Sequence, residues 1–316
     1  MKYIESLRPN MQIDEVYLCK SKQSAMTKAG RPYENVTLQD KSGTLDAKIW
    51  DPDNPGIAEF EAMDYVAVAG EVTQFQGRNQ LNIRRARLAD ENEYDPKDYL
   101  PTSEKSVEAM YEQLLGYIDS VQNHYLKQLL DAFFREETFR KEFQKHSAAK
   151  TIHHGFIGGL LEHTLSVTRF CDFMAGQYPV LNRDLLLTAA MFHDIGKVKE
   201  LAAFPQNDYT DEGQLIGHIV IGMEMVSDQI KKIPDFPVTM ANELKHCILA
   251  HHGELEYGSP KKPALAEAVA LSIADNADAK METLTEAFAK VEPGNLSWQG
   301  YNRLFESNLR RTSDIE

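Results

Sequence analysis

Seven histidine and aspartate side chains that are able to bind metal ions occur at five separate places in the second half of the sequence. Imidazole and carboxylate groups hold manganese, iron, cobalt, nickel or zinc at hydrolytic centres. An aspartate that directly follows a histidine can bridge two cations, and two cations can hold both oxygens of a phosphoryl displacement. The sequence therefore indicates a metal centre built from His163, His193, Asp194, His218, His251, His252 and Asp275.

Helical spacing predicts that these histidines point inward. Eight of the ten histidines fall within residues 153–252. His163 shares a helical stripe with Leu160, and His218 and His251 lie on similar apolar faces. A buried imidazole without a partner is costly, and shared metal ions would satisfy all of them at once. The alternative, unrelated core or surface histidines, explains any single one but not the whole set.

The predicted aspartate ligands follow apolar runs. Asp194 lies at the end of a run that starts at Leu185, where an isolated buried carboxylate would be even more costly than an imidazole. The second aspartate follows the apolar stretch 268–273, and both Asp275 and Asp278 are candidates there. Spacing alone does not decide between these two.

This pattern resembles the HD superfamily of metal-dependent phosphohydrolases over roughly residues 150–290. His193-Asp194 matches the pair for which the superfamily is named, and the family's Ala-Asp step matches Ala274-Asp275, which favours Asp275. The extra middle histidine and the adjacent histidine pair are similar to the two-metal branch, which includes cyclic-dinucleotide phosphodiesterases.

The resemblance implies a role for each residue. One metal would be held by His163, His193, Asp194 and Asp275, and a second by Asp194, His218, His251 and His252. Asp194 and Lys197 would be catalytic, with Asp194 bridging the ions and Lys197 facing the scissile phosphate. At Gly159 some two-metal relatives carry a carboxylate, so the occupancy of the second site stays open at this point.

The first 93 residues differ from the rest in their pattern of apolar and polar residues. Alternating apolar and polar residues predict five strands, and turn signals rich in Gly, Pro, Asn and Asp separate them. The strands are expected at 15–21, 33–39, 44–50, 65–75 and 80–86, with a helical segment at 56–62. This order matches the small Greek-key barrel of the OB-fold, so we expect residues 1–93 to form an OB-fold domain that binds nucleic acid.

OB-folds bind single strands through aromatic side chains and a basic groove. The candidate contacts in this domain are Lys20, Lys22, Lys28, Arg31, Tyr33, Lys48, Trp50, Phe75, Arg78 and Asn79. The alternative places Trp50 and Phe75 in the barrel core and leaves the lysines as a solvated face.

Residues 94–146 are expected to form a polar linker and a helical lead-in. Thr102 or Ser103 is the predicted cap of the first helix, and helices follow at 123–135 and 137–146. Residues 147–316 keep a helical period throughout and form the expected all-α HD domain. The apolar surface of 103–146 could serve self-association as a homo-oligomer or pack within the domain.

Two loops are candidates for substrate contact. The glycine-rich segment 150–160 opens the helix of His163, and its His153 and His154 could reach a phosphate near the helix start. A flexible entry loop with exposed histidines is the alternative. The loop 207–214, just before His218, could also line the cleft.

Bulk properties are those of an ordinary cytoplasmic protein. The 316 residues are enough for two domains, and neither a signal peptide nor a membrane span is expected. The cysteines Cys19, Cys171 and Cys247 fit core positions in a reducing compartment. The net charge of −14 weakens a nucleic-acid function without excluding it, because local patches and bound cations can make the contacts.

An OB module ahead of an HD domain resembles the YhaM family of bacterial 3′–5′ exoribonucleases along the whole chain. The resemblance implies hydrolysis of single-stranded RNA to nucleoside 5′-monophosphates, with Mn²⁺ or Co²⁺ and up to two ions, and single-stranded DNA as a second substrate. Two alternatives remain at this point. One is a phosphohydrolase of small nucleotides or cyclic dinucleotides, and the other is a nucleic-acid-binding regulator without activity.

Overall fold

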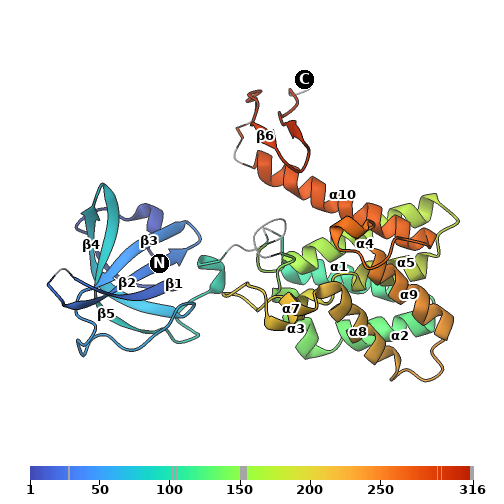
Figure 1. Cartoon of the computed structure of the whole chain (residues 1–316), viewed down its shortest axis with the longest axis horizontal. Coiled ribbons are helices and arrows are strands. Elements are labelled where there is room, and N and C mark those ends of the chain that lie inside the picture. Colours follow the sequence, from blue (N-terminus) through green and yellow to red (C-terminus); the bar gives the residue numbers. More distant parts are fainter. Residues whose placement is uncertain are drawn as a thin grey trace. The chain divides into compact units, whose positions relative to one another are not determined.

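The computed structural model describes residues 1–27, 29–100, 103, 105–149, 155–289, 291–292 and 294–313. The chain forms two compact units, Met1–Pro101 and Thr102–Glu316, and each is described by itself (Figure 1). The predicted nucleic-acid contact of Lys28 and the predicted substrate contacts of His153 and His154 lie outside the described residues.

The first unit is a closed five-stranded barrel. Its strands are β1 (Gln12–Met26), β2 (Pro32–Asp40), β3 (Gly43–Ile49), β4 (Tyr65–Phe75) and β5 (Arg78–Leu88), and a 3₁₀ turn, η1 (Ile4–Ser6), precedes them. The order around the barrel is β1-β2-β3-β5-β4, with β3 and β5 parallel and the other pairs antiparallel. This is the predicted OB-fold arrangement, and the prediction is confirmed.

Alternation of buried and outward side chains builds this barrel. Along β4 every second residue from Val66 to Val72 is buried, because successive side chains of a strand point to opposite faces. The inward side chains of all five strands meet in one apolar core that includes Leu38, Ile49 and Leu81. Each such aliphatic side chain stabilises the fold by roughly 1.5–3 kcal/mol, and the outward positions are left for other roles.

The helix predicted at 56–62 does not form, and that prediction was wrong. Residues 50–64 make turns, and Ile57 instead forms an isolated parallel bridge with Ala86 of β5. Pro52, Pro55 and Gly56 explain the difference, since proline and glycine lower helix stability.

Residues 94–100 pack on the barrel. Tyr94 stacks on Tyr65 with 3.8 Å between ring centroids, and Tyr99 is buried. Asp98, at the end of the 3₁₀ turn η2 (Pro96–Asp98), accepts a hydrogen bond of 2.7 Å from the hydroxyl of Tyr3. This part of the predicted linker therefore belongs to the compact unit that contains the barrel.

The second unit is helical, as predicted. Its helices are α1 (Val107–Ser120), α2 (His124–Phe134), α3 (Glu137–Lys145), α4 (Gly159–Gln177), α5 (Arg183–Phe192), α6 (Lys197–Glu200), α7 (Asp211–Leu215), α8 (His218–Ile230), α9 (Val238–Ala250) and α10 (Ala266–Phe288), with a 3₁₀ turn, η3 (Leu255–Tyr257). None of the helices in the described ranges is long and apolar enough to cross a membrane.

Helices α1 to α3 contribute to the core that holds the later helices in place. Met110, Leu114 and Ile118 of α1 and Phe134 of α2 are buried in one cluster with α4, α5, α9 and α10. The apolar surface of 103–146 thus packs within its own unit, one of the two roles that its sequence allowed. The predicted homo-oligomer stays a prediction.

The cap of α1 differs from the expectation. Ser106 accepts the hydrogen bond from the backbone of Ala109, and the hydroxyl of Ser103 instead bonds to the carboxylate of Glu162 in α4. The cap prediction was wrong for Ser103, and Thr102 lies outside the described residues.

A short hairpin of β6 (Tyr301–Asn302) and β7 (Ser307–Asn308) follows α10, so the prediction that helix continues to the end of the chain was wrong there.

The two cysteines of this unit and Cys19 of the barrel are free and buried. Burial raises the pKa of Cys19 to about 11 and that of Cys247 to about 12, so these thiols stay protonated and pack as small apolar groups.

Candidate metal centre and nucleic-acid groove

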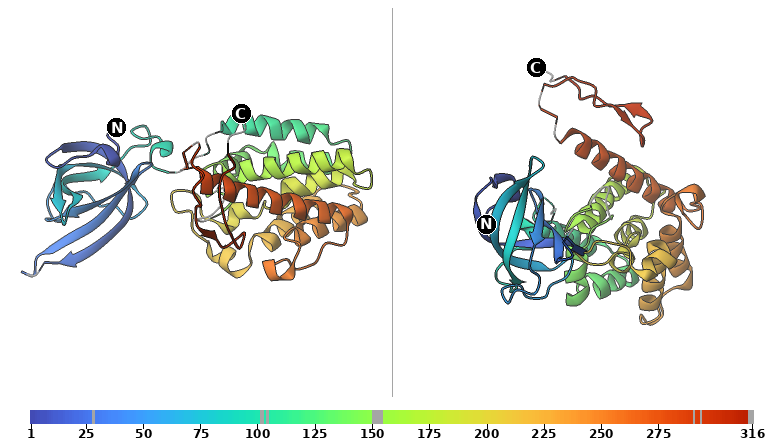
Figure 2. Two further views of the ribbon diagram at one scale, coloured as in Figure 1. Left: turned by 90° about the horizontal axis from the view of Figure 1, so that it is seen from above. Right: turned by 60° about the vertical axis from the view of Figure 1, so that its left-hand side comes forward.

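Five helices bring the predicted metal ligands together. His163 lies in the second turn of α4, and Asp275 lies in α10, which runs beside α4 (Figure 2). His193 and His251 cap the C-terminal ends of α5 and α9, and His218 is the first residue of α8. Ligands that are far apart in the sequence therefore meet because these helices share one core.

The ligands form two clusters of three. His163, His193 and Asp275 make the first cluster, and in each cluster the ligand atoms lie within 4.8 Å of one another. The second cluster is His218 with the adjacent pair that follows α9, His251-His252. All seven side chains chosen from the sequence are accounted for once Asp194 is added.

Asp194 lies between the two clusters and turns one oxygen to each. Its Oδ2 is 3.3 Å from Nε2 of His163 and 3.4 Å from Nε2 of His193. Its Oδ1 is 3.4 Å from Nε2 of His218 and 3.7 Å from Nε2 of His251. A carboxylate in this position has the arrangement needed to be shared by two cations.

A second partner fixes the orientation of four of the imidazoles. Nδ1 of His193 and of His251 each lies 2.7 Å from a backbone carbonyl of the helix that it caps. Nδ1 of His163 is 2.7 Å from Asp278, and Nδ1 of His218 is 2.9 Å from Glu200. Because carbonyls and carboxylates accept, each Nδ1 donates, and each Nε2 faces the centre.

Burial and neighbouring charges shift the pKa values of the centre in opposite directions. Burial lowers the pKa of His163, yet hydrogen bonds to Asp194 and Asp275 raise it well above the ordinary imidazole value. Burial raises the pKa of Asp194, but the charge of Lys197 and the neighbouring imidazoles hold it well below the usual carboxyl range. The pKa of His251 is lowered, first by burial and then by His193. The centre thus keeps its carboxylates ionised and His251 neutral.

Lys197 makes the closest contact to Asp194. Its Nζ lies 2.6 Å from Oδ2 of Asp194, one helical turn away at the start of α6. Burial lowers the pKa of Lys197, but the charge of Asp194 raises it above the ordinary value, so the ammonium group stays charged. The structure therefore places a fixed positive charge beside the carboxylate between the clusters.

The donor set fits divalent cations. Among the described residues, three buried side-chain atoms have no hydrogen-bond partner, and they are Oδ1 of Asp194, Nε2 of His218 and Nε2 of His251. Buried polar atoms normally have partners, and here all three converge on one point. Neutral imidazole nitrogens and a carboxylate oxygen are suitable ligands for a first-row divalent metal.

Glycine at position 196 permits the close approach of α8 to the His-Asp turn. A Cβ added to Gly196 would lie 2.1 Å from the carbonyl oxygen of His218 and 2.6 Å from the backbone nitrogen of Gly222. Only a residue without a side chain fits there. Gly196 therefore sets how closely His218 comes to Asp194.

Sequence reasoning missed Glu200 and gave Asp278 a different role. Asp278 was an alternative to Asp275 as a ligand, and it instead bonds to the outer nitrogen of His163. Glu200 accepts hydrogen bonds of 2.9 Å from both the backbone and the ring of His218. The only signal for Glu200 in the sequence was its place one turn after Lys197, which does not distinguish it from a surface residue.

The loop 207–214 lies against the backbone of Glu200. Thr210 donates a backbone hydrogen bond of 2.9 Å to the carbonyl of Glu200, and a Cβ on Gly213 would lie 2.2 Å from that same oxygen. The loop thus supports the residue that orients His218. Its predicted role in lining the cleft stays a prediction.

The barrel carries an open groove of about 720 Å³ on its outward face. It is lined by Tyr33, Asp46, Lys48, Trp50, Phe75, Gln76, Arg78, Asn79 and Gln80. Trp50 is 52% exposed and Phe75 is 60% exposed, which rules out the alternative that these two rings belong to the barrel core.

Local geometry explains how the aromatic rings gather. Tyr33 and Trp50 stack with 5.2 Å between ring centroids, and Nζ of Lys48 lies 5.2 Å from the Tyr33 ring. Lys48 and Trp50 share one face because they are two residues apart at the end of β3. Gln76 and Gly77 both have positive φ, as a tight two-residue hairpin turn requires, and the turn sets Phe75 opposite Arg78.

The other predicted contacts that fall within the described residues do not line this groove. Lys20 and Arg31 are exposed elsewhere on the barrel. Nζ of Lys22 donates to the carbonyl of Phe60 at 2.9 Å and lies 3.4 Å from the carboxylate of Glu34. The structure therefore brings together Tyr33, Lys48, Trp50, Phe75, Arg78 and Asn79, but not these three cations.

The helical fold and its His-Asp centre define an HD-domain protein, and the HD domain family matches residues 160–280. The chain is 37% identical over 286 residues to the "3'-5' exoribonuclease YhaM" of Bacillus velezensis, with 90% of each chain covered. The protein of the same name from Bacillus subtilis is 35% identical with the same coverage. That of a Geobacillus species is 36% identical over 301 residues, covering 93% of this chain and 91% of the relative.

The chain therefore belongs to the YhaM family, and the family resemblance expected from the sequence is confirmed. Among solved structures, the second OB-fold domain of replication protein A from Methanococcus maripaludis is 22% identical to this chain. It covers 28% of this chain and 95% of its own, with a TM-score of 0.22.

Proposed function

We propose that this protein is a metal-dependent 3′–5′ exoribonuclease that hydrolyses single-stranded RNA to nucleoside 5′-monophosphates. The observation that carries the proposal is the position of Asp194, whose two oxygens each face one cluster of three ligand atoms. The names of relatives at 35–37% identity supply the direction of hydrolysis and the type of substrate.

The seven ligands would hold up to two divalent ions. His163, His193 and Asp275 would bind one ion, His218, His251 and His252 the other, and Asp194 would bind both. Bound divalent ions lower the pKa of water and stabilise the charge that develops on a phosphoryl group. We infer Mn²⁺ as the ion, with Co²⁺ as a substitute, because the family resemblance implies these metals, and the imidazole and carboxylate ligands are compatible with both.

The remaining residues of the site stabilise charge on the substrate or orient the metal ligands. Lys197 presents a fixed ammonium group at the edge of the centre, suited to a non-bridging oxygen of the scissile phosphate. Asp278 and Glu200 hold one histidine of each cluster in a single orientation. Asp194 and Lys197 are therefore the proposed catalytic residues.

The groove on the barrel is the proposed binding site for the RNA strand. Tyr33, Trp50 and Phe75 offer ring faces on which bases of any sequence can stack, and Lys48 and Arg78 offer positive charge for the phosphates. These contacts do not depend on a 2′-hydroxyl group, which supports single-stranded DNA as a second ligand. We place the enzyme in the cytoplasm, where its RNA substrates and reduced thiols are expected.

An end-labelled oligoribonucleotide assay with Mn²⁺ tests the proposal. With a label on the 5′ end, the expected result is a ladder of progressively shorter labelled products, and with a 3′ label the mononucleotide appears first. EDTA abolishes both patterns. Hydrolysis of mononucleotides or cyclic dinucleotides alone would replace the proposal with a small-molecule phosphohydrolase, and binding without cleavage would replace it with a nucleic-acid-binding regulator.

A further inference from the structure

The C-terminal hairpin, residues 295–313, is a feature that the proposed function does not use. It exposes four large apolar side chains, Leu296 (41%), Trp298 (66%), Tyr301 (65%) and Leu304 (49%). In the described part of the chain, neither apolar core includes a side chain from this segment. An isolated two-stranded hairpin is marginally stable, so exposed rings on one indicate a binding surface.

Three arginines occur in the hairpin segment. The segment contains Arg303, Arg310 and Arg311 together with Glu306, and Asp314 and Glu316 follow it in the sequence. The whole chain has a net charge of −14. Exposed arginines such as Arg303 and Arg310 supply local positive charge to a polyanion even where the chain as a whole is acidic.

Aromatic and guanidinium groups lie together on this surface. The Arg310 guanidinium lies over the Trp298 ring at 5.5 Å from its centroid, and both side chains are exposed. The strands pair through Tyr301 and Asn308, and the backbone of Gln299 donates to Leu309 at 2.8 Å, which continues the ladder toward Trp298. Stacking rings beside arginines are the combination that binds single strands without regard to sequence.

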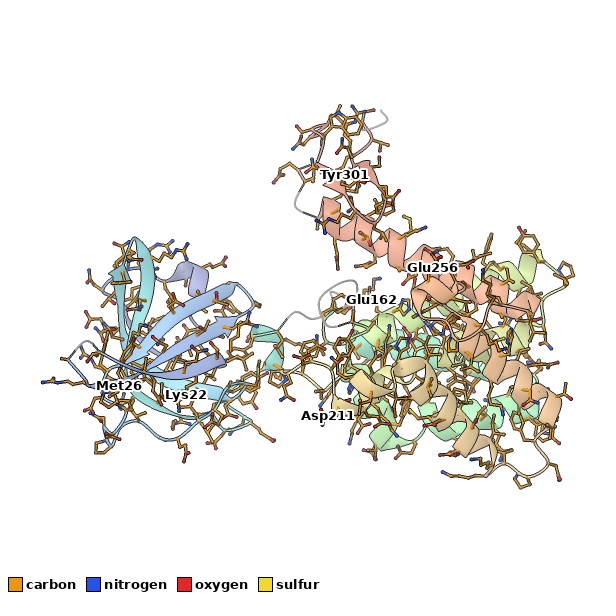
Figure 3. The ribbon with its side chains drawn as sticks, in the orientation of Figure 1. Lys22, Met26, Glu162, Asp211, Glu256 and Tyr301 are labelled. Atoms are coloured by element: carbon orange, nitrogen blue, oxygen red, sulfur yellow. The ribbon has the colours of Figure 1, made fainter. Side chains whose placement is uncertain are left out.

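The hairpin is attached to the helix that carries a predicted metal ligand. From Asp275 to Phe288, the last residue of α10, the helix extends by about 20 Å. Arg311 donates a hydrogen bond of 2.8 Å to the carbonyl of Val291, which ties the last strand back to the region that follows α10. Tyr301 lies beyond that end of the helix, away from the other helices (Figure 3).

We propose that the C-terminal hairpin is a second binding site for single-stranded RNA, in which Trp298 and Tyr301 stack on bases and Arg303 and Arg310 contact phosphates. This inference rests on the proposed function. It adds a strand contact on the same unit as the metal centre, independent of the groove on the barrel. The other occupant that the exposed leucines would suit, a second copy of the chain, is an outcome of the test.

The two tryptophans of the chain allow the two sites to be observed separately, because Trp50 lines the groove and Trp298 lies in the hairpin. In the full-length Trp50→Phe variant, the tryptophan fluorescence comes from Trp298 alone. Titration with a single-stranded oligouridylate in EDTA, which leaves the strand uncut, is expected to quench this fluorescence in a saturable manner that added salt reverses. Trp298→Phe, which reports on Trp50, is the matched variant.

Two further variants sharpen the test. In the Trp50→Phe background, Tyr301→Ala is expected to weaken the RNA titration about tenfold, since stacking on one base contributes an effect of that order. Tyr178→Ala removes an equally exposed ring (59%) at the end of α4 and is expected to leave the titration unchanged. Equal effects of both variants would overturn the proposal.

Other outcomes also decide the question. Trp298 fluorescence that stays constant at RNA concentrations that saturate Trp50 would overturn the hairpin site. Fluorescence that depends on protein concentration without RNA, together with dimers in sedimentation, would assign the surface to a second copy. The end-labelled cleavage assay remains the separate test of the proposed function. If the enzyme cleaves RNA but the Trp298 fluorescence does not respond to RNA, only the hairpin site is rejected.

Discussion

Most ligands of the metal centre are buried, and four of its imidazoles have their own acceptor for the nitrogen that faces away from it, whereas two rings of the barrel groove are more than half exposed. His193 and His251 are fully buried, while Trp50 and Phe75 are 52% and 60% exposed. A buried, preorganised site loses its function when one group is removed, because the remaining groups stay unpaired. An open groove makes separate contacts and should lose affinity in small steps.

The largest effect is expected at the carboxylate between the two clusters. Asp194→Ala removes the group that faces both, so cleavage of labelled RNA should fall by at least roughly a thousandfold, the upper end of what one electrostatic group contributes in other enzymes. RNA binding, measured by fluorescence anisotropy, should stay close to that of the unaltered chain. Retained cleavage would show that the site assignment is wrong.

The next effect concerns the close contact at Gly196. Gly196→Ala places a Cβ 2.1 Å from the carbonyl oxygen of His218, and overpacking of this kind costs about 1–3 kcal/mol of unfolding free energy. Gly116→Ala is the control, because no atom lies within 4 Å of its Cβ in α1, and it should stabilise by roughly 0.5–1 kcal/mol. Urea unfolding of both variants measures the difference, and equal stabilities would contradict the packing argument.

The two clusters should be separable by their outer carboxylates. Glu200→Ala is expected to weaken one Mn²⁺ site and Asp278→Ala the other, each by about 10- to 100-fold, because each removes the acceptor that orients one histidine. Isothermal titration with Mn²⁺ reports both sites. Glu200→Gln keeps an oxygen that can accept from His218 and should recover part of the affinity, whereas a purely structural role predicts that both sites weaken together.

Smaller changes are expected in the groove. Phe75→Ala should weaken RNA binding by about 1–3 kcal/mol, the usual contribution of one stacked base. Leu88→Ala is the matched control, since Leu88 is 52% exposed at the end of β5 and does not line the groove. Anisotropy titrations give both affinities. A complete loss of binding in Phe75→Ala would mean that the groove is a cooperative site like the metal centre.

The smallest effect is expected for a single charge. Arg78→Gln should reduce RNA affinity at every sequence to a similar extent and lower the slope of log affinity against log salt by about 1. Titrations at several salt concentrations measure this slope. An unchanged slope would exclude Arg78 from phosphate contact and leave the aromatic rings as the main contribution of the groove.

The sequence predicted the features that leave a periodic pattern of apolar residues, namely the ligand-bearing helices and the strands of the barrel. The ligand histidines could be found because a buried imidazole on an apolar helical face requires a partner, as for His163 and His251. The barrel could be found because its strands alternate in period two. Both signals are local in the chain.

What could not be predicted depends on contacts between distant segments. Glu200 can orient His218 only because the loop after α6 brings the start of α8 back beside Glu200. The sequence of residues 201–217 does not indicate this return. Lys22 is a lysine like Lys48, yet its ammonium group donates to the carbonyl of Phe60 and pairs with Glu34 on the neighbouring strand β2. In the turns at 50–64, where a helix was predicted, Ile57 forms an isolated bridge with Ala86 of β5, a contact that the local sequence does not reveal.

The buried cysteines have a practical consequence for spectroscopy. Because Cys19, Cys171 and Cys247 are inaccessible and their thiols resist ionisation, maleimide reagents should leave them unmodified in the native protein. A cysteine introduced at an exposed position of each unit would then take up a dye selectively, without replacement of the native ones. Energy transfer between two such dyes could follow the separation of barrel and helical unit while RNA is being degraded.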